Sequence, residues 1–261
     1  MKSIKCLVSA VLYVLMLGLC LPVLAQPISI YQFRHVSNED MSQFMHRETT
    51  YWEKVAEKAV EDGNLQFWAV LVKVGGFDIP NSPNVLFINT FNDIDATGGI
   101  WDPSALFPDV PYESMDTFSM SKVMHTMFVR NQYYVEADGV NPDEDINYVN
   151  MIFHDTNSPG ALIDLEIEHW GSFIESSMNE NKTPQKGWGN AVILSPSGPD
   201  IKATTISYDL YSTLKDALAP TWAEGTVFPD EGLDQIEELE INRRISNIYQ
   251  IVTVVSADMD N

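Results

Sequence analysis

Cysteine is almost missing from this chain of 261 residues, and its only two copies, Cys6 and Cys20, lie close to the N-terminus. Lys2 and Lys5 come before an apolar run, and small residues precede Gln26. This order is typical of a cleaved secretory signal. We therefore expect residues 1–25 to be removed and the protein to be secreted or periplasmic.

The lack of cysteine after residue 25 excludes several kinds of chemistry. The mature chain has no disulfide, no thiolate nucleophile and no cysteine ligand for a metal. An uncleaved membrane anchor is the alternative for the N-terminus, but the apolar run is short for a span of ~20 residues. Leu19 before Cys20 argues against lipidation.

Basic residues are scarce as well. Without the signal, 13 Lys and Arg stand against 37 Asp and Glu, a net charge of −24. Such a surface repels nucleic acid and anionic membranes, so we expect neither as a partner. The acidic residues are scattered, which favours a solvated surface over an acidic tail for partner binding.

Several site motifs are also missing. The sequence has no Gly-rich phosphate loop, no Gly-x-Ser-x-Gly elbow and no His pair at metal-ligand spacing. We therefore expect no cofactor and no metal. A small-molecule ligand is the partner that remains.

The sequence does contain one irregular motif written twice. "WDPSALFPD" at 101–109 returns as "WAEGTVFPD" at 222–230. Other matches follow in the same order at nearly constant offset: "ETTYW" (48–52) with "EIEHW" (166–170), Trp68 with Trp188, Phe91 with Tyr211, "YYVEAD" (133–138) with "TVVSAD" (253–258), and His35 with His154. Ordered matches of this kind indicate a duplication. It would comprise copies at 26–140 and 147–261 and a linker at 141–146.

Each copy reads as β-α-β-β-α-β. In the first, Ser37 and Asp40 begin a helix that ends at Gly63. The remaining expected elements are strands at 28–35, 65–74, 84–91 and 131–137 and a helix at 112–128. In the second copy we expect strands at 147–154, 188–194, 201–209 and 247–256 and helices at 158–180 and 231–245.

This element order is the ferredoxin-like pattern, an antiparallel sheet with helices on one face. With the Glu48-x3-Trp52 helix motif and Trp68 opening the second strand, the chain resembles the dimeric α+β barrel superfamily, in particular its antibiotic-biosynthesis-monooxygenase-like and NIPSNAP-like domains. The resemblance implies an α+β fold in which two tandem ferredoxin-like repeats pack their sheets face to face as a pseudo-dimeric barrel. A monomer and a small-molecule pocket between sheet and helices would follow.

Glu48 and Glu166 are the most informative residues. Each falls within the apolar stripe of its predicted helix, where a carboxylate is costly unless it is paired or hydrogen-bonded. Each could be a general acid or base, or a polar anchor in a pocket. The alternative is a structural glutamate bonded to backbone N–H groups or an arginine.

Two further sets are site candidates. His35 and His154 end the first strand of each copy and could shuttle a proton with the glutamates, unless they are only surface or turn residues. Four tryptophans could line an apolar or aromatic-ligand pocket, or simply fill the core: Trp52, Trp68, Trp170 and Trp188.

Two functions therefore remain open. One is a protein that binds a small apolar or aromatic molecule and acts as a cofactor-free oxygenase or isomerase. The other is a non-catalytic scaffold or partner-binding protein whose buried glutamates are structural. The fold alone does not choose between them.

Overall fold

The computed structural model describes residues 27–75, 82–198, 202–242 and 244–257, so the expected signal lies outside the described residues. The strands are β1 (Ile28–Val36), β2 (Leu65–Lys73), β3 (Val85–Phe91), β4 (Ser121–Glu136), β5 (Tyr148–His154), β6 (Gln185–Ser195), β7 (Thr205–Tyr211) and β8 (Ile245–Ser256). The α-helices are α2 (Met41–Arg47), α3 (Glu53–Glu61), α4 (Tyr112–Met115), α5 (Pro142–Asp145), α6 (Pro159–Leu165), α7 (Ser172–Asn179), α8 (Leu214–Leu218) and α9 (Asp230–Leu239), and two π-helical segments are η1 (Glu48–Trp52) and η2 (Glu166–Gly171).

The eight strands form one closed antiparallel barrel in the order β1-β3-β2-β8-β5-β7-β6-β4. The first half of the chain supplies four neighbouring strands and the second half the other four. Antiparallel pairs β2–β8 and β4–β6 join the two sets at both edges. The expected pair of sheets stacked face to face is therefore corrected to a single closed sheet, in which each set satisfies the edge groups of the other.

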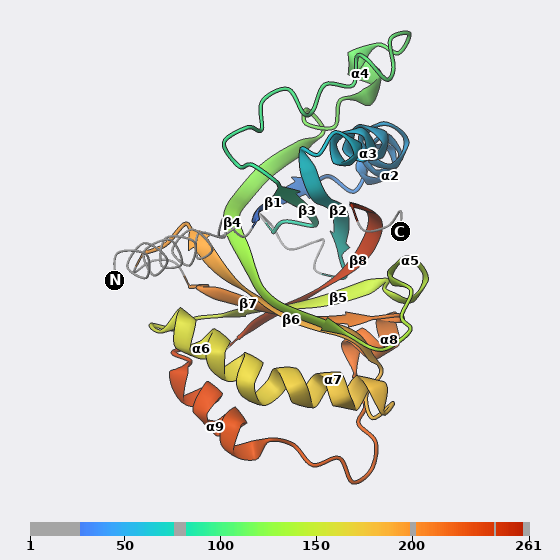
Figure 1. Cartoon of the computed structure of the whole chain (residues 1–261). Helices are drawn as coiled ribbons and strands as arrows, with labels where there is room; N and C mark the ends of the chain where they lie inside the picture. The colour runs from blue at the N-terminus through green and yellow to red at the C-terminus, as the bar shows by residue number, and fades with distance from the viewer. Residues whose placement is uncertain (1–26, 76–81, 199–201, 243, 258–261) are drawn as a thin grey trace, which may run out of the picture.

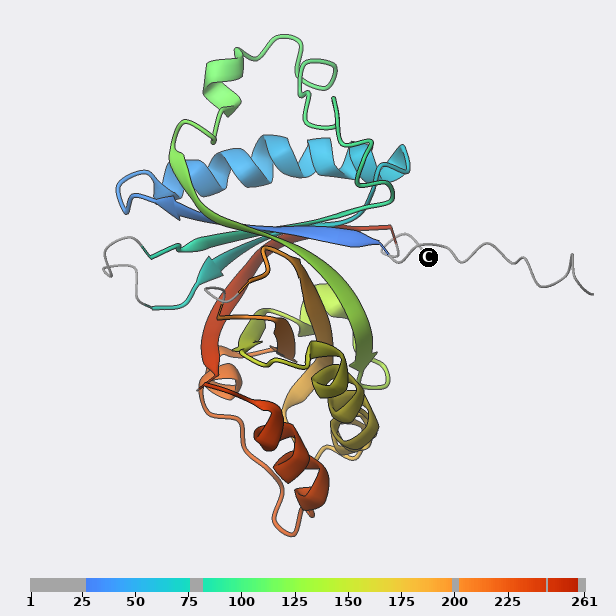
Figure 2. The same ribbon diagram turned by 90° about the vertical axis from the view of Figure 1, so that its left-hand side faces the viewer.

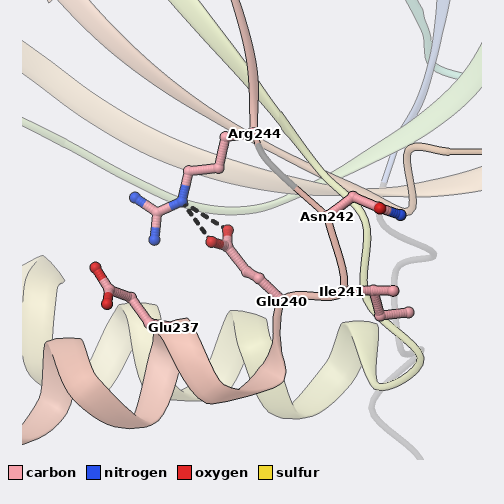
Figure 3. A pocket seen from close by; sticks show the side chains of 5 residues that line it. All are labelled: Glu237, Glu240, Ile241, Asn242 and Arg244. Carbon is pink, nitrogen blue, oxygen red and sulfur yellow. Dashed lines mark hydrogen bonds and ion pairs between the residues drawn. The ribbon is translucent and has the colours of Figure 1, made fainter.

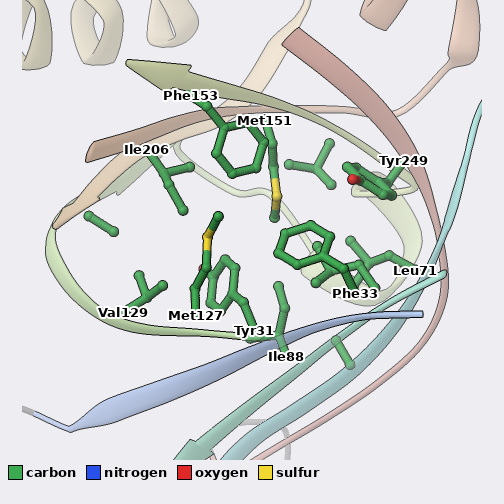
Figure 4. Packing of buried hydrophobic residues seen from close by; sticks show 14 of the residues in the cluster. Tyr31, Phe33, Leu71, Ile88, Met127, Val129, Met151, Phe153, Ile206 and Tyr249 are labelled. Carbon is green, nitrogen blue, oxygen red and sulfur yellow. The ribbon is translucent and has the colours of Figure 1, made fainter. Parts of the chain in front are cut away.

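The core of the molecule lies inside this barrel, where both halves contribute apolar side chains (Figure 4). Phe33 and Phe153 come from the two first strands and their ring centroids lie 6.2 Å apart. Met127 and Met151 fill the space beside them. Because alternate residues of a strand face opposite sides, the other face of each strand is turned outward, toward the helices.

The helices cover this outer face on two opposite sides of the barrel. Figures 1 and 2 show α2 and α3 along the strands of the first half and α6 and α7 along those of the second, while α9 packs against α6 on the side away from the barrel. In both halves the first helix runs through a π-helical segment, η1 or η2, whose first residue is the buried Glu48 or Glu166. The expected helices at 37–63 and 158–180 are thus continuous but contain a local change of hydrogen bonding.

The two halves share one strand register. Arg34 pairs with Val85 between β1 and β3, as His154 pairs with Thr205 between β5 and β7. Trp68 pairs with Asn89 as Trp188 pairs with Asp209. The two members of each corresponding pair are 120 residues apart in the sequence. The outward-facing residues of the two halves can therefore be compared one by one.

The expected helix at 112–128 is wrong. Only Tyr112–Met115 is helical, and β4 begins at Ser121 and continues for 16 residues. The first part of β4 pairs with β1 and its last part with β6. Closing the barrel with these long-range hydrogen bonds overrides the local helical spacing of the sequence. In the second half, the expected helix at 231–245 is observed as α9, Asp230–Leu239.

Candidate functional site

The space between the second half's strands and its helices is unusually polar. On β7, Ile206, Tyr208 and Leu210 belong to the barrel interior, so the alternate residues Ser207 and Asp209 face the helices. Helix-facing polar residues from β5 and β6 join them there, namely Asn150, His154 and Asn190. A polar layer in this position must be hydrogen-bonded to be stable.

Glu166 stands at the centre of this polar layer. It opens η2, directly after the apolar turn of α6, and is 5% exposed. Ser207 Oγ donates to Glu166 Oε1 (2.8 Å), and Asn190 Nδ2 donates to Oε2 (3.1 Å). Both carboxylate oxygens are therefore held by side chains of the sheet.

His154 connects Glu166 to the helix α9. Its Nε2 lies 2.5 Å from Ser207 Oγ and 3.6 Å from Glu166 Oε1, and its Nδ1 lies 2.5 Å from Glu240 Oε1. Since Ser207 uses its proton on Glu166, Nε2 must donate to Ser207. A second proton then lies between Nδ1 and the Glu240 carboxylate. The result is a continuous hydrogen-bonded chain, here called the relay, made of Glu240, His154, Ser207 and Glu166.

The relay ends at an open hollow of about 500 Å³, here called the α9 hollow, lined by Glu237, Glu240, Ile241, Asn242 and Arg244. It is largely open to solvent, and Ile241 is the apolar residue of its described lining. Arg244 Nε donates to both oxygens of Glu240, at 2.6 and 2.8 Å (Figure 3). The Glu240 side chain is 12% exposed, whereas that of His154 is 2% exposed. Glu240 is therefore the member of the relay that a molecule in the hollow can touch.

Asp209 forms a second buried branch beside the relay. Gln185 Nε2 donates to its Oδ1 (2.6 Å) and Asn150 Nδ2 to its Oδ2 (3.5 Å). Burial, together with the charge of Glu166, raises the pKa of Asp209 to about 7, against the lowering effect of the two amides. The layer thus holds a carboxyl group that is partly protonated near neutral pH.

The first half has a different arrangement around Glu48. This residue is 2% exposed, and burial raises its pKa to about 7, while a hydrogen bond with Thr117 and the charge of Arg34 lower it. The Arg34 guanidinium lies over the rings of Phe87 and Phe118, at 4.5 and 5.3 Å from their centroids. Most of the surrounding side chains are apolar and form a core cluster under α2 and α3.

The two candidate histidines differ in their surroundings. His154 meets Glu166, but Nδ1 of His35 lies 2.9 Å from the backbone oxygen of Ser82. The strand register aligns His154 with Arg34, not with His35. The sequence match was one residue out of register, and a slip of one residue in a strand exchanges the two faces of the sheet.

The four candidate tryptophans all lie on the helix side of the barrel. Trp68 and Trp188 are 2% exposed and belong to the apolar clusters under the helices. Trp52 is half-buried and its Nε1 donates to the backbone oxygen of Met115 (2.8 Å). Trp170 is half-buried in an aromatic group with Phe173, Trp222 and Phe228.

Sequence reasoning missed three residues of this site. Ser207 lies in "ISYD", whose polar residues alternate with apolar ones, and this alternation was a signal for a polar face. Glu240 and Arg244 lie just after α9. Glu240 meets His154 only through the fold, across 86 residues, and Arg244 in turn binds Glu240. No spacing rule connects them.

In the described ranges, no group of three or more His, Cys, Asp or Glu side chains is placed to hold a metal ion. Within the same ranges, no helix has the length and apolar character needed to cross a membrane.

No family model and no curated protein matches the sequence. Solved structures do match the fold. An anthrone oxidase-like protein aligns with a TM-score of 0.55 at 13% identity, over 90% of this chain and 95% of its own. A candidate monooxygenase from Lactobacillus acidophilus aligns with 0.54 at 7% identity, over 89% and 97%. A mutant chlorite dismutase from Candidatus Nitrospira defluvii aligns with 0.50 at 9% identity, over 87% and 91%.

These structures belong to the dimeric α+β barrel superfamily. At such low identities the likeness concerns the fold alone, because one fold supports many functions. The chain has a mixed α+β fold with an eight-stranded antiparallel sheet, and its structural neighbours are of dimeric α+β barrel type.

Proposed function

We propose that the protein binds a small neutral aromatic molecule in the α9 hollow and removes a proton from it, as a cofactor-free oxygenase or isomerase. The observation that carries this proposal is the relay, because it joins a buried carboxylate to a carboxylate that borders a hollow. A buried ionisable chain of this length is costly as a purely structural element. The oxygenase-like fold of the neighbours is consistent with such chemistry.

In the proposed mechanism Glu240 is the general base. Its Oε2 takes up the proton from the ligand, while Oε1 keeps its hydrogen bond with His154 Nδ1, 2.5 Å away. Ser207 and Glu166 hold the imidazole ring in place through Nε2 and balance its positive charge. Arg244 keeps Glu240 oriented through the bonds from its Nε.

Anthrone is a suitable probe, since it is a neutral three-ring ketone with an acidic C–H bond and one structural neighbour is anthrone oxidase-like. Loss of the proton gives a carbanion that reacts with dioxygen. Anthrone and one O2 then give anthraquinone and one water, so no external reductant is needed. An isomerase would instead return the proton to another carbon atom.

The proposal is tested with Glu240→Gln, which retains the shape of the side chain but cannot take up the proton. We expect anthrone-dependent oxygen uptake and anthraquinone absorbance to fall ~10²–10⁴-fold, as for the loss of a general base. Glu238→Gln, on the exposed side of the same helix, is the matched control with the same change in charge. Equal rates in wild type and Glu240→Gln would contradict the proposal.

A ligand-independent measurement complements this assay. Native mass spectrometry of the purified protein should detect a co-purified small molecule. If the wild type retains no molecule and neither binds nor converts anthrone or α-tetralone, an aromatic ketone with C–H bonds next to its carbonyl group, the non-catalytic alternative is favoured.

We also propose that the chain is a tandem duplication of a ferredoxin-like unit, with copies at 26–140 and 147–261, and that it acts as an exported monomer. The shared strand register and the two π-helical segments support the duplication. N-terminal sequencing of the exported protein tests the cleavage, with Gln26 as the expected first residue.

A further inference from the structure

Two polar atoms in the second half's helix–sheet layer have no hydrogen-bond partner within the described part of the chain: Oδ1 of Asn190 and Oγ1 of Thr205. Both side chains are 0% exposed. In native proteins roughly nine in ten or more buried polar groups are paired with protein or ordered water. Two unpaired atoms in one layer therefore point to a bound partner.

The two side chains are diagonal neighbours on one face of the sheet. Asn190 lies opposite Ser207 between β6 and β7, and Thr205 precedes Ser207 by two residues, on the same face of β7. Thr205 also lies opposite His154. Both unpaired side chains thus flank Ser207, which links His154 to Glu166.

We propose that Asn190 and Thr205 form a binding site for a buried water molecule beside the relay. The partner must donate to the amide oxygen of Asn190 and exchange a hydrogen bond with the Thr205 hydroxyl, and a water molecule does both. Asn190 Nδ2 is already used on Glu166, which fixes Oδ1 as the free end of the amide. The π-helical segment η2 lies over this site, and such segments are frequent at functional sites.

The bound water would add a mobile proton carrier next to Glu166, at the end of the relay opposite to the hollow. It would also explain why this layer tolerates more polar side chains than the protein alone can pair. This water site depends on the buried polar groups of the fold and not on the identity of any substrate.

The first half of the chain supplies the test. Valine occupies both corresponding positions there, Val70 and Val85, and both are fully buried. Thr205→Val therefore introduces a side chain of similar shape that the barrel already accommodates at the equivalent place. Thr205→Ser keeps the hydroxyl and is the matched control for the lost methyl group.

The sign of the change in melting temperature shows whether the Thr205 hydroxyl binds a water molecule. If the hydroxyl binds water, Thr205→Val breaks those hydrogen bonds and leaves Asn190 Oδ1 unpaired, so the Tm falls by roughly 3–6 °C relative to Thr205→Ser. If the hydroxyl has no partner, its removal relieves an unpaired buried group and the Tm stays level or rises, which overturns the proposal.

A high-resolution crystal structure gives a second readout. We expect one ordered water within hydrogen-bonding distance of both Asn190 Oδ1 and Thr205 Oγ1 in the wild type, and its loss in Thr205→Val. A wild-type map without solvent density at this place would also overturn the proposal, even if the variant failed to fold.

Discussion

The two helix–sheet layers of this barrel have the same backbone register but opposite chemistry. In the first half, Phe87, Val70 and Val85 face the helix, and in the second half Ser207, Asn190 and Thr205 take the same places. Arg34 corresponds to His154. At these positions the first layer is apolar, whereas the second adds a hydrogen-bonded network to its apolar cluster around Trp188.

This difference indicates which residues serve stability and which serve function. Apolar packing stabilises a layer without further conditions, whereas a buried polar network is stable only when each member is paired. The apolar half shows that the fold does not need the network. The polar residues of the second half therefore call for another reason, and proton transfer at the α9 hollow is the one proposed above.

The largest expected effect is a loss of turnover in Glu166→Gln that Glu48→Gln does not share. Glu166 balances the charge of the relay, so its change should lower turnover of the anthrone probe by ~10²–10⁴-fold. Glu48 lies in the apolar half, and we expect its change to alter turnover less than two-fold. Steady-state rates of both variants measure this. A comparable loss in both would mean that the two halves act alike.

The next effect concerns packing. Phe87→Ala should cost about 3–5 kcal/mol of unfolding free energy, because it leaves a cavity under Arg34 and the helix. Ser207→Ala should cost only about 1–3 kcal/mol, for the lost hydrogen bonds, but should reduce turnover. Urea denaturation gives both values. If Ser207→Ala were the more destabilising, the polar layer would be the structural one.

Two buried carboxyl groups predict how stability depends on pH. The pKa of Glu48 rises from 4.5 to about 7, and that of Asp209 from 3.8 to about 7, in both cases chiefly because of burial. The folded state then binds more protons than the unfolded chain between about pH 4 and pH 7. Stability from these groups is present below pH 4 and is lost as the pH rises through 7, by about 3 kcal/mol for Glu48.

Denaturation at pH 5 and pH 8 measures this loss. Asp209→Asn introduces the residue that the first half has at the same position, Asn89. In this variant and in Glu48→Gln, the free energy of unfolding should depend less on pH than in the wild type. Parallel pH profiles in wild type and both variants would show that these carboxyl groups titrate normally.

The smallest expected effect concerns Arg34. Arg34→Lys retains the charge but loses the planar group that stacks on Phe87 and Phe118, so we expect a cost of about 0.5–2 kcal/mol. Turnover should not change. A thermal melt compared with that of Lys122→Arg, a basic exchange at an exposed position of β4, gives the measurement. A change in turnover would bring Arg34 into the functional site.

The sequence predicted much of the fold because hydrophobic periodicity is local. Glu48 and Glu166 were expected on the inward face of their helices, and both are buried. The helix at 112–128 failed because barrel closure is a long-range effect. His35 was misplaced because a match of one letter cannot fix strand register, and Glu240 was missed because its contact with His154 exists only in three dimensions.

The π-helical segments make the glutamates sensitive to chain length as well as to residue type. A regular helix turns by about 100° per residue, so deleting one residue from α6 would turn its two flanks against each other by that angle. Either Glu166 would leave Ser207 and Asn190, or Leu162 and Ile163 would leave the core. A π-helical turn holds one residue more than an α-helical turn, so a deletion within 167–171 should restore a regular turn and keep both faces in place. A scan of single deletions along this helix would therefore show that its length is fixed by the contacts of Glu166.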